Sequence, residues 1–167
     1  MPRVDRLYVD TNVFIDLFER SDELSGLLAE LFLVERNGRE PFLATSELTV
    51  AELLVDPIRR GDDRLIQIYE NWALSNDYLS VGPVNLHVLF AAARLRAQDT
   101  SLKPPDAIHL STAMHFRCSH LLTGDRRLSG PYELSDYRSG IVKGPFRLEI
   151  LRLEVEVIKH LVKEAAR

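Results

Sequence analysis

The segment Leu7–Asp16 constrains this chain most, because it predicts a buried strand that runs directly into a helix. Its first three apolar residues are typical of a strand, and the apolar residues within 13–18 recur at helical spacing. Asp10 falls at the end of the strand, and Thr11 or Asn12 is expected to cap the helix. Ligands of open α/β sheets bind beyond the carboxyl ends of the strands. A carboxylate there could hold a cation; alternatively, Asp10 only closes the strand and caps the helix.

Strand-like and helix-like segments alternate along the chain as far as Gly124. Strands are predicted over 4–10, 41–45, 78–81 and 120–123, and helices over 12–18, 22–34, 46–54, 61–74, 84–98 and 104–116. Pro57 is expected to stop the helix that begins at Ser46. This alternation predicts an α/β fold with three α/β/α layers and a mostly parallel sheet of about five strands.

The C-terminal part of the chain, residues 126–167, is less regular. Gly-Pro and Ser-Gly pairs within 126–146 predict irregular surface chain. Residues 151–157 alternate between apolar and charged, which indicates a strand with one solvated face. The same stretch also fits a helical face over 151–162. We expect a strand to about Val157 and then a short helix to the end.

Composition limits the class of protein. A chain of 167 residues is expected to form one domain. The single cysteine, Cys118, excludes an intrachain disulfide and a cysteine-based zinc site. No segment has the pattern of a signal peptide or a membrane span, so a cytoplasmic protein without membrane contact is expected. The net charge of −4 argues against nucleic-acid binding through overall charge, so any such binding requires a local site.

Four acidic residues stand at positions that the predicted topology would bring together. Asp10 and Asp125 each follow a predicted strand, and Asp106 lies in the first turn of a helix. Glu52 lies among apolar residues of a helix, where a carboxylate is usually avoided. Chain segments that follow parallel strands lie at one edge of the sheet, so all four carboxylates could converge there.

Converging carboxylates raise one another's pKa values unless a cation is present. Oxygen-only ligands suit Mg²⁺ or Mn²⁺ better than zinc, and such ions generate hydroxide and stabilise a phosphoryl transition state. Each acid also has a structural explanation. Asp106 would complement its helix dipole, Asp125 would cap a turn, and Glu52 would pair with Arg59 or another base.

Four segments of the sequence, in this order, resemble the four motifs of the PIN domain. They are Val9–Asp16, Ser46–Leu54, Pro105–Ala113 and Leu121–Arg126. The resemblance covers about residues 4–128 and points to the VapC-type toxin ribonucleases. Residues 126–167 depart from the pattern, because they form a longer extension than the ending of small members.

The resemblance implies an endoribonuclease that uses Mg²⁺ or Mn²⁺ to hydrolyse RNA phosphodiester bonds, leaving a 3′-hydroxyl and a 5′-phosphate. It implies that the catalytic and metal-binding residues are Asp10, Glu52, Asp106 and Asp125, with Asn12 and Thr123 as polar supports. It further implies the toxin of a type II toxin–antitoxin pair, a homodimer and a cognate antitoxin.

Basic residues near these acids are candidate RNA contacts. Lys103 precedes Asp106, and Arg126 and Arg127 follow Asp125, where they could hold phosphates; the alternative is that they are solvated surface charges. His109 and His115 lack the i, i+4 spacing of a helical zinc pair, so we interpret His109 as a core or surface residue. Two other functions stay open: a PIN-like binding or scaffold module without activity, and a DNA or flap nuclease.

Overall fold

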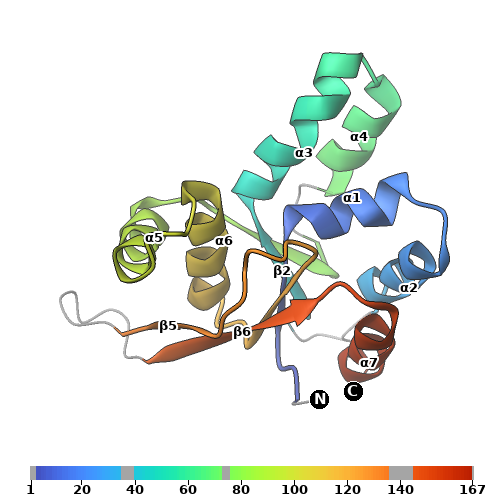
Figure 1. Cartoon of the computed structure of the whole chain (residues 1–167). Coiled ribbons are helices and arrows are strands. Elements are labelled where there is room, and N and C mark those ends of the chain that lie inside the picture. The colour runs from blue at the N-terminus through green and yellow to red at the C-terminus, as the bar shows by residue number, and fades with distance from the viewer. Residues whose placement is uncertain (1–2, 35–39, 73–75, 136–144, 167) are drawn as a thin grey trace.

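The computed structural model describes residues 3–34, 40–72, 76–135 and 145–166 (Figure 1). Its strands are β1 (Leu7–Val9), β2 (Leu43–Ser46), β3 (Leu79–Gly82), β4 (His120–Thr123), β5 (Tyr132–Leu134) and β6 (Phe146–Arg152). Its helices are α1 (Thr11–Glu19), α2 (Glu23–Phe32), α3 (Glu47–Arg60), α4 (Asp63–Trp72), α5 (Leu86–Gln98), α6 (Pro104–His115) and α7 (Val155–Ala165). Over these described stretches, no helix has the length and apolar character needed to cross a membrane.

The strands form one sheet in the order β3-β2-β1-β4-β6-β5. All neighbouring pairs are parallel except β5, which runs antiparallel to β6. Tyr8 in the central strand β1 is in register with Ala44 of β2 and with Leu121 of β4. The predicted α/β class with a mostly parallel sheet is confirmed, although the described sheet has six strands rather than about five.

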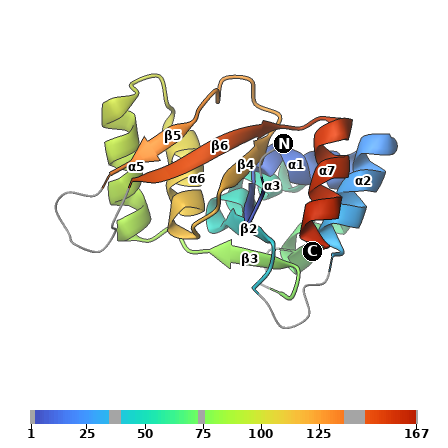
Figure 2. The ribbon, with the colours of Figure 1, turned by 90° about the horizontal axis from the view of Figure 1, so that it is seen from below.

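Helices cover both faces of the sheet (Figures 1 and 2). Alternate residues of β1 point to opposite faces, as strand geometry requires. Leu7 and Val9 pack into a core that includes residues of α1, α2 and α7, whereas Tyr8 packs into a second core with residues of α5 and α6. The predicted three layers are therefore present. In the middle layer, the carboxyl ends of β1 and β4 lie side by side, because these strands are parallel neighbours.

Helix α3 is longer than predicted. It continues through the buried Pro57 to Arg60 and ends at Gly61, which has a left-handed φ of 68°. Proline lacks one helical N–H, but this loss does not by itself end a helix whose remaining residues stay in helical geometry. The added turns extend α3 beyond Glu52, so Glu52 lies inside the helix rather than near its end.

The C-terminal part differs from prediction in two ways. The short strand β5 lies within the segment predicted to be irregular, where residues 136–144 fall outside the described part of the chain. The predicted strand to Val157 ends at Arg152 instead, and helix α7 already begins at Val155. The core that contains residues of α2 also buries Val157, Ile158 and Leu161 of α7. A helix can place these three residues on one buried face, whereas a strand would expose alternate residues.

Candidate functional site

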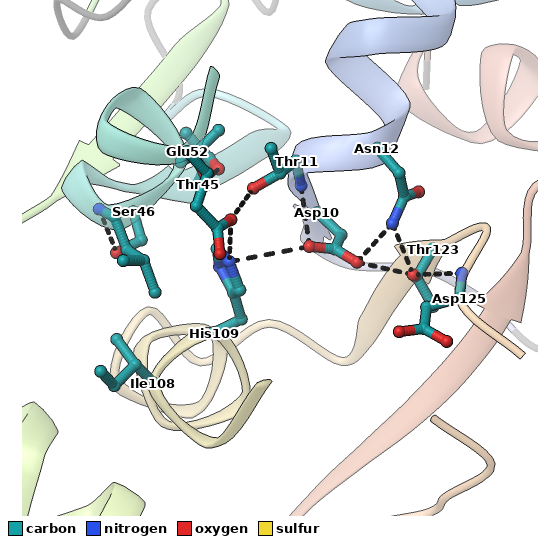
Figure 3. A network of polar contacts seen from close by, with 12 residues as sticks. Asp10, Thr11, Asn12, Thr45, Ser46, Glu52, Ile108, His109, Thr123 and Asp125 are labelled. Atoms are coloured by element: carbon teal, nitrogen blue, oxygen red, sulfur yellow. Dashed lines mark hydrogen bonds and ion pairs between the residues drawn. The ribbon is translucent and has the colours of Figure 1, made fainter. Parts of the chain in front are cut away.

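Asp10 lies at the junction of β1 and α1 and is almost fully buried, at 7% exposure. It caps α1 itself, in place of the predicted Thr11 or Asn12: its Oδ1 accepts a hydrogen bond from the backbone N–H of Thr11 at 2.8 Å. Its Oδ2 accepts from Asn12 Nδ2 at 2.7 Å and from Thr123 Oγ1 at 2.6 Å (Figure 3). Three donors therefore fix both oxygens of this carboxylate.

Asn12 and Thr123 connect Asp10 to the loop that follows β4. Asn12 Nδ2 also donates to Thr123 Oγ1 at 3.1 Å, and Asn12 Oδ1 accepts from the backbone N–H of Gly124 at 2.7 Å. The backbone N–H of Asp125 donates to Thr123 Oγ1 at 2.9 Å. The loop that carries Asp125 is therefore tied to the strand end that carries Asp10.

Glu52 reaches this network from the middle of α3. Its Oε2 accepts hydrogen bonds from Thr11 Oγ1 and, at 3.0 Å, from His109 Nε2 (Figure 3). Burial raises the pKa of Glu52, but the hydrogen bonds from His109 and Thr11 outweigh it and hold that pKa below its usual value. The alternative partner Arg59 instead pairs with Asp56, so Glu52 belongs to the network around Asp10.

His109 is the residue of this network that sequence reasoning missed. The residue is 3% exposed, its Nδ1 lies 2.8 Å from the hydroxyl of Tyr8, and its Nε2 lies 3.7 Å from Asp10 Oδ1. It is a core residue, as one of the two interpretations held, and it also lies inside the acidic site, which was not predicted. One signal was available: His109 follows Asp106 by three residues, and this spacing places both side chains on the same face of α6.

Asp106 and Asp125 complete the acidic edge. Burial raises the pKa of Asp106, and the negative charges of Asp125 and Asp10 raise it further against the opposing effect of Arg127. Arg127 donates from Nε to both oxygens of Asp125 at 3.0 Å. Those hydrogen bonds hold the pKa of Asp125 below its usual value, with a smaller contribution from Lys103.

The structure thus brings the four predicted acids to one edge of the sheet. In the described part of the chain, however, no three histidine, cysteine or carboxylate side chains are arranged to hold a metal ion as they stand. Of the predicted RNA contacts, Lys103 and Arg127 lie within electrostatic reach of Asp125, and Arg126 is exposed beside them. The roles of these residues in metal and RNA binding stay predictions.

The C-terminal extension also supports the site. At the end of β6, Arg152 donates from Nη1 to the carbonyl oxygen of Asp125 at 2.7 Å and from Nη2 to that of Leu128 at 2.5 Å. The next residue, Leu153, donates its backbone N–H to the carbonyl oxygen of Thr123 at 3.2 Å. The loop after β4 is therefore held by β6 as well as by Asn12.

A mostly parallel sheet with carboxylates gathered at its carboxyl edge defines a PIN-like α/β protein. The family model described as PIN domain matches residues 7–134, and the chain belongs to the PIN domain family. A comparison with curated proteins found no match.

Several solved structures share the fold. A toxin–antitoxin complex from Klebsiella pneumoniae is 28% identical, with a TM-score of 0.51 over 72% of this chain and 86% of that one. VapC20 from Mycobacterium tuberculosis, described as a toxin that cleaves the sarcin–ricin loop, is 18% identical, with a TM-score of 0.54 over 69% and 86%. VapBC2 from Rickettsia felis, bound to a DNA fragment from its promoter, is 17% identical, with a TM-score of 0.53 over 72% and 89%.

Proposed function

We propose that this protein is a divalent-metal-dependent endoribonuclease that hydrolyses phosphodiester bonds of RNA in the cytoplasm and acts as the toxin of a type II toxin–antitoxin pair. Membership of the PIN family and the similarity to a toxin–antitoxin complex support this proposal. The observation that carries it is the gathering of acids from distant parts of the chain at one edge of the sheet. Thr11 donates hydrogen bonds to both Asp10 and Glu52, and the charges of Asp10 and Asp125 act on Asp106.

The donor chemistry fits Mg²⁺ or Mn²⁺, because the four acids offer only carboxylate oxygens. Burial raises the pKa of Asp106, and the charges of Asp125 and Asp10 add to that rise, while Arg127 opposes it; a bound cation would favour the ionised form of Asp106. The residues that would hold the ion are Asp10, Glu52, Asp106 and Asp125. When bound, such an ion supplies Lewis-acid stabilisation of the phosphoryl group and lowers the pKa of attacking water.

The basic residues beside the acids would bind the RNA backbone. Arg127 donates to both oxygens of Asp125 and neutralises part of the charge that would attract a cation, so we expect the guanidinium to turn away when an ion binds. Its exposed guanidinium would then be free to take a phosphate, for which its planar donors are well suited. Lys103 and Arg126 would contact neighbouring phosphates, while Asn12 and Thr123 keep Asp10 fixed in place.

The test is RNA cleavage with Mn²⁺ or Mg²⁺ by the full chain and by Asp10→Asn and Asp106→Asn. Both variants should lose cleavage. The matched control is Asp56→Asn, because Asp56 is exposed on α3 and pairs only with Arg59 among the residues for which the structure gives contacts. Equal, metal-independent background in all four proteins would overturn the proposal in favour of a scaffold. Cleavage of DNA in preference to RNA would indicate a DNA or flap nuclease instead.

We further propose a homodimer and a cognate antitoxin as partners. Exposed apolar side chains are available for such contacts on α3 (Val55 and Ile58) and on α5 (Leu86, Leu89 and Phe90). Light scattering of the purified protein tests the dimer, and a monomer at micromolar concentration would contradict it. Relief of growth arrest by a small neighbouring reading frame tests the antitoxin.

A further inference from the structure

A buried chain of polar side chains lies behind Glu52. Tyr8 is fully buried in the central strand β1, and its hydroxyl lies 2.8 Å from Nδ1 of the buried His109. On the other side of the ring, Nε2 lies 3.0 Å from Oε2 of Glu52 (Figure 3). The imidazole therefore connects the core of the sheet to a carboxylate of the candidate site.

The direction of these hydrogen bonds follows from the groups involved. An ionised carboxylate only accepts hydrogen bonds, so Nε2 of His109 has to donate to Glu52. In a neutral imidazole the other nitrogen is then an acceptor, and it takes the hydroxyl hydrogen of Tyr8. The hydroxyl of Tyr8 carries that hydrogen at neutral pH, because the ordinary pKa of a tyrosine is about 10. With Nε2 donating to Glu52, His109 is not itself available as a metal ligand.

Two donors meet at the same oxygen of Glu52. Thr11 Oγ1 and His109 Nε2 both donate to Oε2, and among the described residues no hydrogen bond reaches Oε1. Thr11 also donates its backbone N–H to Asp10 Oδ1 at 2.8 Å. Thr11 therefore fixes Glu52 relative to Asp10, while His109 fixes the rotation of the Glu52 carboxylate.

We propose that Tyr8 and His109 are positioning residues that hold Glu52 by one carboxylate oxygen and leave the other oxygen for the divalent cation of the site. The cation in this statement rests on the proposed function, whereas the arrangement of hydrogen bonds does not. Groups that orient metal ligands from behind contribute to metal affinity although they do not touch the ion.

The first experiment measures Mn²⁺ binding to the metal-free full chain by titration calorimetry. His109→Leu is expected to weaken binding roughly 10- to 100-fold, the usual effect of losing such a group. His109→Gln should restore most of the affinity, because its amide nitrogen reaches the place of Nε2. Tyr8→Phe should weaken binding less than His109→Leu does. The matched control is His115→Gln, since His115 is exposed at the end of the same helix. Unchanged affinity in a folded His109→Leu would overturn the proposal.

A double-mutant cycle separates positioning from direct contact with the ion. If His109 acts through Glu52, then adding His109→Leu to Glu52→Gln should cause little further loss of affinity, because the group to be positioned is already altered. Fully additive losses would overturn the proposal. Should His109→Leu not fold, Tyr8→Phe takes its place in the cycle. Tyr8→Phe should then weaken Mn²⁺ binding in the wild type but not in Glu52→Gln, and equal losses in both backgrounds would overturn the proposal.

The second experiment needs neither metal nor RNA. Nitrogen-15 NMR of the metal-free protein should show His109 with hydrogen on Nε2 and none on Nδ1, assigned by comparison with His109→Gln. Hydrogen on Nδ1, whether in the other tautomer or in a doubly protonated ring, would overturn the proposed hydrogen-bond arrangement. If the NMR result is as expected but the wild type binds no Mn²⁺ and cleaves no RNA, the proposed function fails while the arrangement of hydrogen bonds stands.

Discussion

The contact between β6 and the loop after β4 predicts how the C-terminal extension affects the site. Arg152 donates two hydrogen bonds, to the carbonyl oxygens of Asp125 and Leu128. In Arg152→Gln the shorter neutral side chain cannot make both, so each carbonyl has to find water or stay without a donor. We expect a less stable protein in which Asp125 is less well fixed.

The size of the effect follows from the two hydrogen bonds. One hydrogen bond from a charged group contributes about 1.5 to 3 kcal/mol, and the half-buried position of Arg152 allows water to replace part of that. We therefore expect a loss of about 2 to 3 kcal/mol in the free energy of unfolding. For a chain of this size that corresponds to a fall of roughly 4 to 12 °C in Tm.

Urea denaturation and calorimetry measure this change, and Arg147→Gln is the matched control on the same strand. Arg147 forms ion pairs with Glu133 and Glu149 at the surface, and exposed pairs contribute no more than about 1 kcal/mol. The rise in Tm caused by Mn²⁺ should also be smaller in Arg152→Gln than in the wild type. A loss of stability no greater than that of Arg147→Gln would refute the reasoning.

Three further predictions concern the acids, and a fourth concerns the close packing of Gly82 against Phe116. Millimolar Mn²⁺ should raise Tm, because the ion relieves carboxylate repulsion only in the folded state; unchanged melting would count against a formed site. Asp106→Asn should have a higher Tm than the metal-free wild type at neutral pH, because the raised pKa of Asp106 means that its ionised form costs folding free energy. This gain in Tm should disappear below the ordinary pKa of 3.8, where the wild-type carboxyl is protonated in both states. A lower Tm of the variant at neutral pH would contradict the prediction. Glu52→Gln should lower the free energy of unfolding by about 1 kcal/mol at neutral pH. Because the pKa of Glu52 is lowered in the folded protein, the extra stability of the wild type should be lost as pH falls below the ordinary pKa of 4.5 and through the folded-state pKa. Extra stability of the wild type that persists in acid would refute this. Gly82→Ala should cost about 1 to 3 kcal/mol in urea denaturation, because its Cβ would lie 2.3 Å from Cε2 of Phe116; a neutral result would mean that this ring moves freely.

Local sequence predicted the elements whose hydrophobic pattern is continuous. The apolar run to Val9 and the helical spacing after it located β1 and α1, and the same kind of pattern located β4 as His120–Thr123. The hydrophobic pattern was insufficient where the same residues fit both a strand and a helix. The segment around Val155 fits a strand or a helix, and burial of Ile158 and Leu161 against the core that contains α2 decided for the helix.

The sequence by itself determined that an acid follows a buried strand at Asp10 and that Asp106 and Asp125 lie at the ends of other predicted elements, because a strand, its end and a following helix are encoded by neighbouring residues. Only the tertiary structure decided which partners these acids have. Glu52 meets Thr11 and His109 across 41 and 57 residues of chain, and Arg152 reaches the Asp125 carbonyl across 27. Such contacts depend on the directions of side chains after the layers have packed, and no local pattern records those directions.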